Sequence, residues 1–344
     1  MLEFLKINAS HGEGGGQIVR SAITLSCITK KPIHLENIRK NRRIPGLRPQ
    51  HLTAITILQE MTDAKVVGAE IGSTELKFIP GKVKEGDFIG DIKTAGSISL
   101  ILQVVIPVIS LSQKKTNLTI KGGTDVLWSP SFDYTEQVVR KAYKRMGIKF
   151  VIEKIKTGYY PKGGGEVKVK MSSTDNIKAI TLTERKTNVA TVLCTFTKIS
   201  ESKILDEIKN IKKILNEKNF SVDTKIKNQD AIDTGASLLV FSVDEKSIIG
   251  VDSLFDKKIQ TFDINMDEFT GNELGLDKNL ADMLVIPASL AEGKTILRVK
   301  EITKHLETNL FVTSKITGCR YGIGRLKEGY EVIIEGISNS GIKQ

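Results

Sequence analysis

The stretch LEFLKINASHGEGGGQIVRSAITLS, Leu2 to Ser26, places a strand pattern, a glycine-rich turn and a helix pattern in direct succession. LEFLKIN predicts a first strand, and the apolar residues after Gln17 recur with helical spacing. Three consecutive glycines, Gly14 to Gly16, lie between them. Glycine loses more backbone entropy on folding than other residues, so a run of three indicates a specific structural or functional need. Free N–H groups at the start of a helix can bind phosphate or sugar oxygens. A plain tight turn is the alternative explanation.

The motif GEGGGQ differs from both common phosphate-binding loops. It lacks the Gly-Lys-Ser/Thr ending of a P-loop, and Gln17 stands where a dinucleotide fingerprint requires its third glycine. Glu13, Gln17 and Arg20 lie beside the triplet. Polar side chains of this kind favour a ligand pocket over a bare turn.

The strand–helix–strand–helix–strand–strand order of the first segment recurs further along the chain. Helical patterns are predicted at Gln50–Met61, Ser97–Leu111 and Phe132–Met146, with strands at NLTIKG, IKFVIEKI and EVKVKM. A second glycine triplet, Gly163 to Gly165, occurs in YYPKGGGEVKV. Its weak similarity to the first triplet indicates a duplicated unit.

Composition changes near Thr183, where lysine and aspartate become dominant, and a second helix–strand–helix–strand–strand series begins at Asn279. The series after the change resembles the series before it, which indicates an insertion. We therefore predict an α/β (α+β) fold of repeated two-helix, four-stranded sheet units. Residues 1–183 and 276–344 would form the large domain, and residues 184–275 a smaller inserted α/β domain.

The bulk composition favours an anionic partner and a reducing compartment. The net charge is +11 and the pI about 9.3, which favours nucleic acid, although general lysine enrichment is the alternative. The three cysteines form no CxxC, which argues against a disulfide framework or a zinc ribbon. The N-terminus lacks a signal-peptide pattern, and the longest apolar stretch contains Pro107 and is too short to span a bilayer. We expect a cytoplasmic location without membrane partners.

The segment IRKNRRIPGLRPQH is a second candidate site. It holds five basic residues, namely Arg39, Lys40, Arg42, Arg43 and Arg48. Arginine forms bidentate contacts to phosphate that lysine cannot form. Two prolines would stiffen the loop, which favours a shaped phosphate clamp. A solvated basic loop is the alternative.

The segment TKHLETN is a third candidate. His305 falls in the first turn of a predicted helix, and Thr303 is a possible N-cap. Asn309 lies four residues further on the same face and could orient the imidazole ring. A lone histidine is usually structural, so the residues alone leave its role open.

Taken together, these segments resemble the RNA 3′-terminal phosphate cyclases of the archaeal type, with the catalytic histidine present. The resemblance runs from about Leu5 through Gly336. It is carried by seven motifs in order: GEGGGQIVRSAITLS, RRIPGLRPQHLTA, TAGSISLILQ, GGTD, YYPKGGGEV, LADM and HLETN. The segment from about 184 to 275 matches only loosely.

The resemblance implies a ligase that forms a phosphoric ester bond. In this family the histidine of H-x-x-T-N, here His305, attacks the α-phosphate of ATP and carries AMP. AMP then passes to an RNA 3′-terminal phosphate, and the adjacent 2′-OH closes a 2′,3′-cyclic phosphate and expels AMP. ATP and a divalent metal, Mg or Mn, are the implied cofactors, and Glu13 the implied metal ligand. The glycine triplet would let bound phosphates approach the backbone.

The remaining site residues are also implied by the motif match. The phosphate- and substrate-binding residues would be Glu13, Gln17, Arg20, Arg39, Arg42, Gln50 and His51. The nucleotide pocket would comprise Gln103, Pro130, Asn279, Leu280, Ala281, Asp282 and Met283.

Two positions depart from the family pattern. Met283 replaces the glutamine of the usual L-A-D-Q motif, and Asn279 occupies a position where an aromatic residue or histidine is frequent. Stacking on the adenine is therefore expected to be weaker. An alternative function is that of a non-catalytic cyclase-like RNA-binding protein of ribosome assembly, but such relatives lack the histidine. Enolpyruvyl transferases share the repeat and lack H-x-x-T-N.

Overall fold

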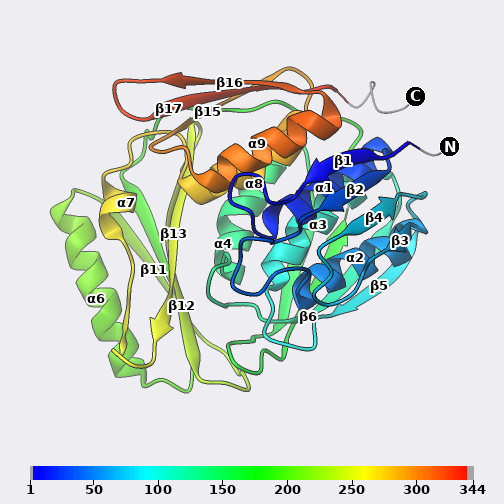
Figure 1. The fold of residues 1–344 in the computed structure, drawn as a ribbon. Coiled ribbons are helices and arrows are strands. Elements are labelled where there is room, and N and C mark those ends of the chain that lie inside the picture. The colour runs from blue at the N-terminus through cyan, green and yellow to red at the C-terminus, as the bar shows by residue number, and fades with distance from the viewer. Residues whose placement is uncertain (1–2, 172, 339–344) are drawn as a thin grey trace.

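A computed structural model of the chain describes residues 3–171 and 173–338. It contains three four-stranded sheets that share one connectivity (Figure 1). The first unit comprises β1 Leu5–Asn8, α1 Gln17–Thr29, β2 Ile33–Glu36, α2 Pro49–Thr62, β3 Lys65–Val67 and β4 Leu76–Ile79. Its strand order is β1-β2-β4-β3, with β1 and β2 parallel and the other pairs antiparallel.

The second unit repeats this arrangement with the order β5-β6-β8-β7. Its elements are β5 Gly86–Asp91, α3 Ile98–Ser110, β6 Thr116–Gly122, the helical segments α4 Phe132–Tyr134, η1 Thr135–Val139 and α5 Arg140–Arg145, β7 Phe150–Lys156 and β8 Gly165–Met171. The predicted helix at 132–146 is therefore present, with a π-helical turn at its centre.

The third unit is interrupted. It comprises β9 Thr181–Leu182, α8 Lys278–Ser289, β15 Lys294–Val299, α9 Lys304–Thr317, β16 Arg320–Arg325 and β17 Tyr330–Glu335. The order β9-β15-β17-β16 matches the other two units. In each unit a helix joins the first two strands, because parallel neighbours need a long crossover connection. The predicted repeat is thus confirmed, in three copies.

The insertion enters between β9 and α8. It comprises β10 Val189–Thr197, α6 Glu201–Glu217, β11 Ser221–Asn228, β12 Gly235–Asp244, β13 Ser247–Asp256, β14 Thr261–Phe262 and α7 Met266–Thr270. Its five-stranded sheet has α6 on its outer side (Figure 1) and a hydrophobic cluster of its own. Other residues of the sheet, including Leu239 and Phe241, join the main core. The predicted domain boundaries remain a prediction.

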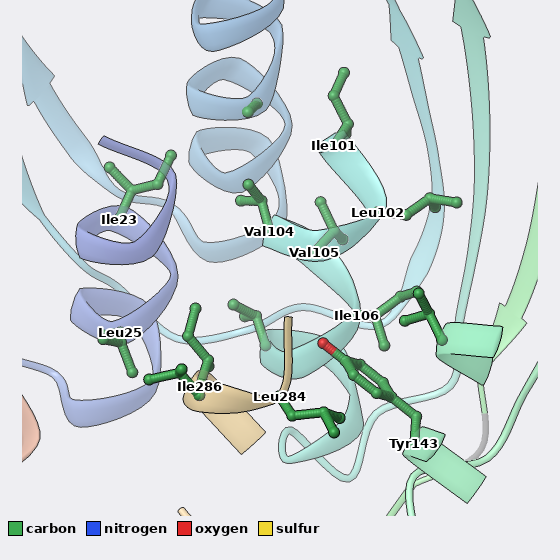
Figure 2. Packing of buried hydrophobic residues seen from close by; sticks show 14 of the residues in the cluster. Ile23, Leu25, Ile101, Leu102, Val104, Val105, Ile106, Tyr143, Leu284 and Ile286 are labelled. Carbon is green, nitrogen blue, oxygen red and sulfur yellow. The ribbon is translucent and has the colours of Figure 1, made fainter. Parts of the chain in front are cut away.

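The core that positions the site lies between the helices of different units. Helix α1 packs against α3 and α9, and α8 packs against α9. Figure 2 shows side chains of α1, α3 and α8 in one cluster, with Tyr143 near Ile106 and Leu284. All but one residue of α3 are buried, so an almost wholly apolar sequence forms a central helix here. No helix in the described ranges is both long and apolar enough to cross a membrane.

The two glycine triplets are not equivalent positions of the repeat. Gly14–Gly16 lies between β1 and α1, whereas Gly163–Gly165 lies in the turn from β7 to β8. Gly163 and Gly164 have positive φ angles of 73° and 72°, as the tight turn requires. The recurring order of elements correctly indicated the duplication, whereas the similarity between the two glycine triplets does not mark corresponding residues.

Candidate functional site

The N-terminus of α9 presents His305 to solvent. The Thr303 hydroxyl caps the helix by accepting the Leu306 N–H at 3.1 Å, as predicted. His305 is exposed in the first turn, whereas Thr308 and Asn309 are buried. The Thr308 hydroxyl accepts the Glu13 N–H at 2.9 Å and donates to the Lys304 carbonyl at 2.6 Å. The turn before α1 is thereby attached to α9.

Asn309 attaches α9 to two further helices. Its Oδ1 accepts a hydrogen bond from the Ser21 hydroxyl at 2.7 Å, and its Nδ2 donates to the Asp282 carbonyl at 2.9 Å. The prediction that Asn309 orients the His305 ring is therefore wrong. Asn309 is only 2% exposed, and α1 and α8 supply the nearest partners for its amide.

The carboxyl group of Asp282 lies beside His305 and Arg20. Burial raises its pKa, and the electrostatic effects of His305 and Arg20 oppose that rise. Within the described residues, its Oδ1 is buried without a hydrogen-bond partner. The charge of this carboxyl group therefore interacts electrostatically with the exposed histidine of α9 and with the guanidinium of α1, without a direct ion pair among the described contacts.

Gln17 and Arg20 extend the network along α1. Arg20 donates from Nη2 to Gln17 Oε1 at 2.6 Å, and Gln17 donates from Nε2 to the Ser21 hydroxyl at 3.4 Å. The pKa of Arg20 is lowered to about 10, mainly by burial. The charge of Asp282 acts against this lowering, and the charge of Arg39 contributes to it. The Nε of Arg20 finds no partner among the residues described.

Three arginines surround the buried ring of His51. The ring accepts the Arg48 N–H at Nδ1 over 3.0 Å, so its single proton is on Nε2. Burial, with the electrostatic effects of Arg20, Arg39 and Arg48 in the same direction, lowers the pKa of His51 to about 3. The ring is therefore neutral at pH 7. Gln50 lies half-buried next to it in the first turn of α2.

Arg39 shows that this cluster favours an anion. Its Nη2 donates to the Ile44 carbonyl at 3.3 Å, while its Nε is a buried donor to which no described atom binds. Burial and the neighbouring Arg48 both lower the pKa of Arg39. Adjacent cations that depress one another's pKa would be relieved by a bound anion, and phosphate matches the fork of arginine donors.

Glu13 and Arg42 form the opposite-charge pair of the site. The Arg42 guanidinium contacts the Glu13 carboxylate and also donates to the Glu13 carbonyl at 3.3 Å. Oε2 of Glu13 is buried and accepts no hydrogen bond from any described residue. Like Oδ1 of Asp282, this oxygen is an unpartnered acceptor of the site.

The glycine triplet packs against these same side chains. A Cβ on Gly15 would collide with the Glu13 carboxylate, and a Cβ on Gly16 with Nε2 of His51. Side chains of the protein thus occupy the space into which a side chain at Gly15 or Gly16 would point, and the approach of phosphates to the backbone stays a prediction. Gly14 has a φ of +62°, which explains that position by backbone geometry.

Residues predicted for the nucleotide pocket divide into three groups. Gln103 and Met283 line a small cavity together with Arg20 and Asp282, and its volume of about 10 Å³ admits roughly one water molecule. Leu280 and Ala281 are fully buried core residues. The others, Pro130 and Asn279, lie in the loop before α4 and in the exposed first turn of α8.

The N-terminus of α8 is attached to the segment that follows Pro130. Asp277, its N-cap residue, accepts hydrogen bonds from the Tyr134 hydroxyl at 2.7 Å and from the backbone N–H of Gly250 at 2.9 Å. Burial raises the pKa of Asp277 to about 6. This carboxyl therefore holds α8, the second unit and the insertion together near Asn279.

A much larger hollow, of about 720 Å³, lies on the insertion between α6 and β11, lined by residues such as Leu205, Lys209 and Ile226. None of the site residues above lines it. The site at α9 therefore differs from this hollow by its many charged and unpartnered groups, and not by a larger cavity volume.

Two contributors were not predicted for the site. Arg48 was counted in the basic loop but not assigned a role, although its spacing to His51 is that of a helix N-cap to the third helical residue. Ser21 carries no sequence signal, because its importance comes from contact with Asn309, 288 residues away.

Comparisons with known proteins show the family of this chain. The family profile described as RNA 3′-terminal phosphate cyclase matches residues 11–323. The RNA 3′-terminal phosphate cyclase of Pyrobaculum aerophilum is 34% identical, over 97% of this chain and 98% of its own length. That of Sulfolobus acidocaldarius is 38% identical, over 90% of this chain and 94% of its own.

A solved structure of EPSP synthase from Acinetobacter baumannii covers 97% of this chain and 65% of its own, at 13% identity and a TM-score of 0.30. This likeness is too low to support any conclusion. The family match and the two relatives are sufficient by themselves: the chain belongs to the RNA 3′-terminal phosphate cyclase family.

Proposed function

We propose that the protein converts an RNA 3′-terminal phosphate into a 2′,3′-cyclic phosphate at the expense of ATP, as a ligase that forms a phosphoric ester bond. The observation that supports this most is the position of His305. His305 is exposed in a motif whose Thr308 and Asn309 make structural hydrogen bonds, and its charge interacts with the buried carboxyl group of Asp282. A ring held in this way is available as a nucleophile.

The proposed reaction has three steps. A ring nitrogen of His305 attacks the α-phosphorus of ATP, a P–N bond forms, and pyrophosphate leaves. An oxygen of the RNA 3′-phosphate then attacks the same phosphorus, breaks the P–N bond and forms an RNA–adenylate. Finally the 2′-OH loses its proton and attacks the former 3′-phosphate, and AMP leaves.

The described residues suit these steps chemically. The unpartnered Nε groups of Arg20 and Arg39 would donate to phosphoryl oxygens. Gln17, Arg42, Gln50 and His51 would complete the phosphate- and substrate-binding set, and Gln103, Pro130, Asn279, Asp282 and Met283 would contact the nucleotide.

Glu13 would hold the divalent cation, Mg or Mn. Its buried, unpartnered Oε2 fits a cation ligand, and a bound metal would neutralise charge on phosphoryl oxygens. Within residues 3–171 and 173–338, the side chains that could already share an ion are His34, Glu36 and Glu75, and Glu13 is not among them. Phosphate oxygens and water would therefore complete the coordination at Glu13.

Labelled ATP tests the proposal directly. Incubation with ATP labelled at the α-phosphate should leave acid-labile, base-stable label on the protein, as a phosphoramidate requires. His305→Ala should abolish the label with an unchanged melting temperature. His11→Ala provides a matched control, because His11 is an exposed histidine in the turn before α1. Label that persists on His305→Ala would refute the mechanism.

A further inference from the structure

The loop between β6 and α4 exposes the single tryptophan of the chain. Trp128 is 95% exposed, and its neighbour Leu127 is 61% exposed. Trp is rarely so accessible, since its ring buries a large apolar area in most proteins. An indole that stands free in solvent indicates a surface that is covered by a ligand.

The backbone holds Trp128 in an unfavourable conformation. Its φ is +61°, a region in which a bulky side chain is a true outlier. The flanking segment is firmly anchored: Ser129 Oγ donates to the Val126 carbonyl at 2.9 Å, and the Ser131 N–H donates to half-buried Asp252 at 2.7 Å. Strain that a rigid loop maintains at an exposed residue is characteristic of functional positions.

Both ends of this loop are attached to the candidate site. At its start, Gly123 exchanges backbone hydrogen bonds with Gly96 and Ile98 at 2.8 and 2.9 Å, and Gly96 lies against the Gln50 side chain. At its end, Tyr134 bonds to the N-cap residue of α8, as described above. Trp128 therefore lies on a loop that spans from the phosphate cluster to the first turn of α8.

A second exposed aromatic residue comes from the adjacent turn. The Thr124 N–H donates to the Gly158 carbonyl at 2.9 Å, which joins the Trp128 loop to the turn after β7. That turn carries Tyr160, which is 70% exposed, and the exposed Lys162. Aromatic rings interspersed with cations are the usual surface for single-stranded nucleic acid, in which bases stack and phosphates pair with the cations.

We propose that Trp128 is a stacking platform for a base of the RNA strand close to its 3′-terminal phosphate. The proposal rests on the proposed function, which supplies the RNA end beside Arg20 and Arg39. A base of RNA fits better than the adenine of ATP, because the indole is open to solvent on a surface loop. Of the residues expected for ATP, Gln103, Asp282 and Met283 line the small cavity beside Arg20, whereas Pro130 shares the loop of Trp128, so the measurement with ATP alone decides between the two bases.

The single tryptophan makes the test direct, since all indole fluorescence comes from Trp128. A short RNA with a 3′-phosphate should quench the emission of the His305→Ala protein, in which chemistry cannot proceed. The same RNA with abasic sugars at its last two positions should quench far less. Quenching by ATP alone, equal quenching by the abasic RNA, or no quenching would each overturn the proposal.

Substitutions provide the second measurement. Trp128→Asn should weaken binding of a 5′-labelled RNA by about 5- to 100-fold, because stacking on the ring is lost. Trp128→Phe should retain most of the affinity. The melting temperature of Trp128→Asn should equal or exceed that of the wild type, because asparagine tolerates the left-handed backbone. Ile71→Ala, at an exposed apolar position on another turn, is the matched control.

Adenylylation by ATP alone separates the two hypotheses. If wild-type protein takes up no label, the proposed function fails. If the wild type is labelled but Trp128→Asn binds RNA normally, only the role of Trp128 fails. If Trp128→Asn loses label as well as RNA affinity, the indole serves the nucleotide, and the proposal is overturned.

Discussion

The hydroxyl of Thr308 accepts the backbone N–H of Glu13 at 2.9 Å, which joins residues 295 positions apart. The bond attaches the carboxylate before the glycine triplet to the helix that presents His305. Conserving this geometry requires α1 and α9 to be packed correctly, so the site forms only when the first and third units are assembled.

Thr308→Val should destabilise the protein by about 1–2 kcal/mol, because the Glu13 N–H would lose its acceptor. Thr313→Val is the matched control on the same helix. The Thr313 hydroxyl is buried without a partner among the described residues, so its removal should be neutral or stabilising. Urea unfolding measures both. An equal loss in the two variants would contradict the importance of the Thr308 bond.

Gly16→Ala should destabilise the fold by about 1–3 kcal/mol, because the new Cβ would displace the ring of His51. Gly16 has a negative φ of −79°, so the effect is steric and does not arise from backbone strain. Gly322→Ala, where a Cβ meets nothing within 4 Å, should be neutral. An unchanged melting temperature for Gly16→Ala would show that the ring does not occupy this space.

His51 should make stability depend on pH. Its pKa of about 3 lies below the usual value of about 6.5, so the unfolded chain binds the proton first. Stability is therefore complete above pH 6.5 and decreases as the pH falls towards 3. The loss between pH 7 and 4.5 should be about 2–3 kcal/mol.

His51→Asn provides the comparison for this pH effect, because asparagine keeps an acceptor for the Arg48 N–H and does not titrate in this range. The difference between wild type and variant, measured by urea unfolding at both pH values, removes the contribution of other groups. Parallel pH profiles would show that His51 is not buried in the neutral form.

Arg39→Ala should lower kcat/KM by about 10- to 100-fold, since a charge-assisted phosphate contact contributes about 1.5–3 kcal/mol. Its melting temperature should not fall, because Arg39 is surrounded by like charges. Arg39→Lys should restore activity only partly, because lysine lacks the planar fork. Arg43→Ala, an exposed position of the same loop, is the control. Full activity of Arg39→Ala would show that Arg39 does not bind phosphate and that the loop is a solvated basic loop.

The order of elements followed from the sequence because its signals are local. The start of α1 and both bounds of α2 and α3 were predicted within one residue of their observed positions, since apolar spacing and caps such as Ser97 act within one turn. The repeat was inferred for the same reason. The inference that the two glycine triplets are equivalent was wrong, because a run of glycines indicates a turn but does not specify which elements the turn joins.

The sequence by itself determined the composition of the site: the motif with His305, the arginine-rich loop and the carboxylate at Glu13. The contacts and the protonation state of these groups followed only from the tertiary structure. Asn309 contacts Ser21 and Asp282 instead of His305, and the neutral state of His51 depends on burial among arginines from different elements. Hydrogen-bond partners and pKa values depend on distances between segments that are remote in sequence, and those distances exist only after the units have packed.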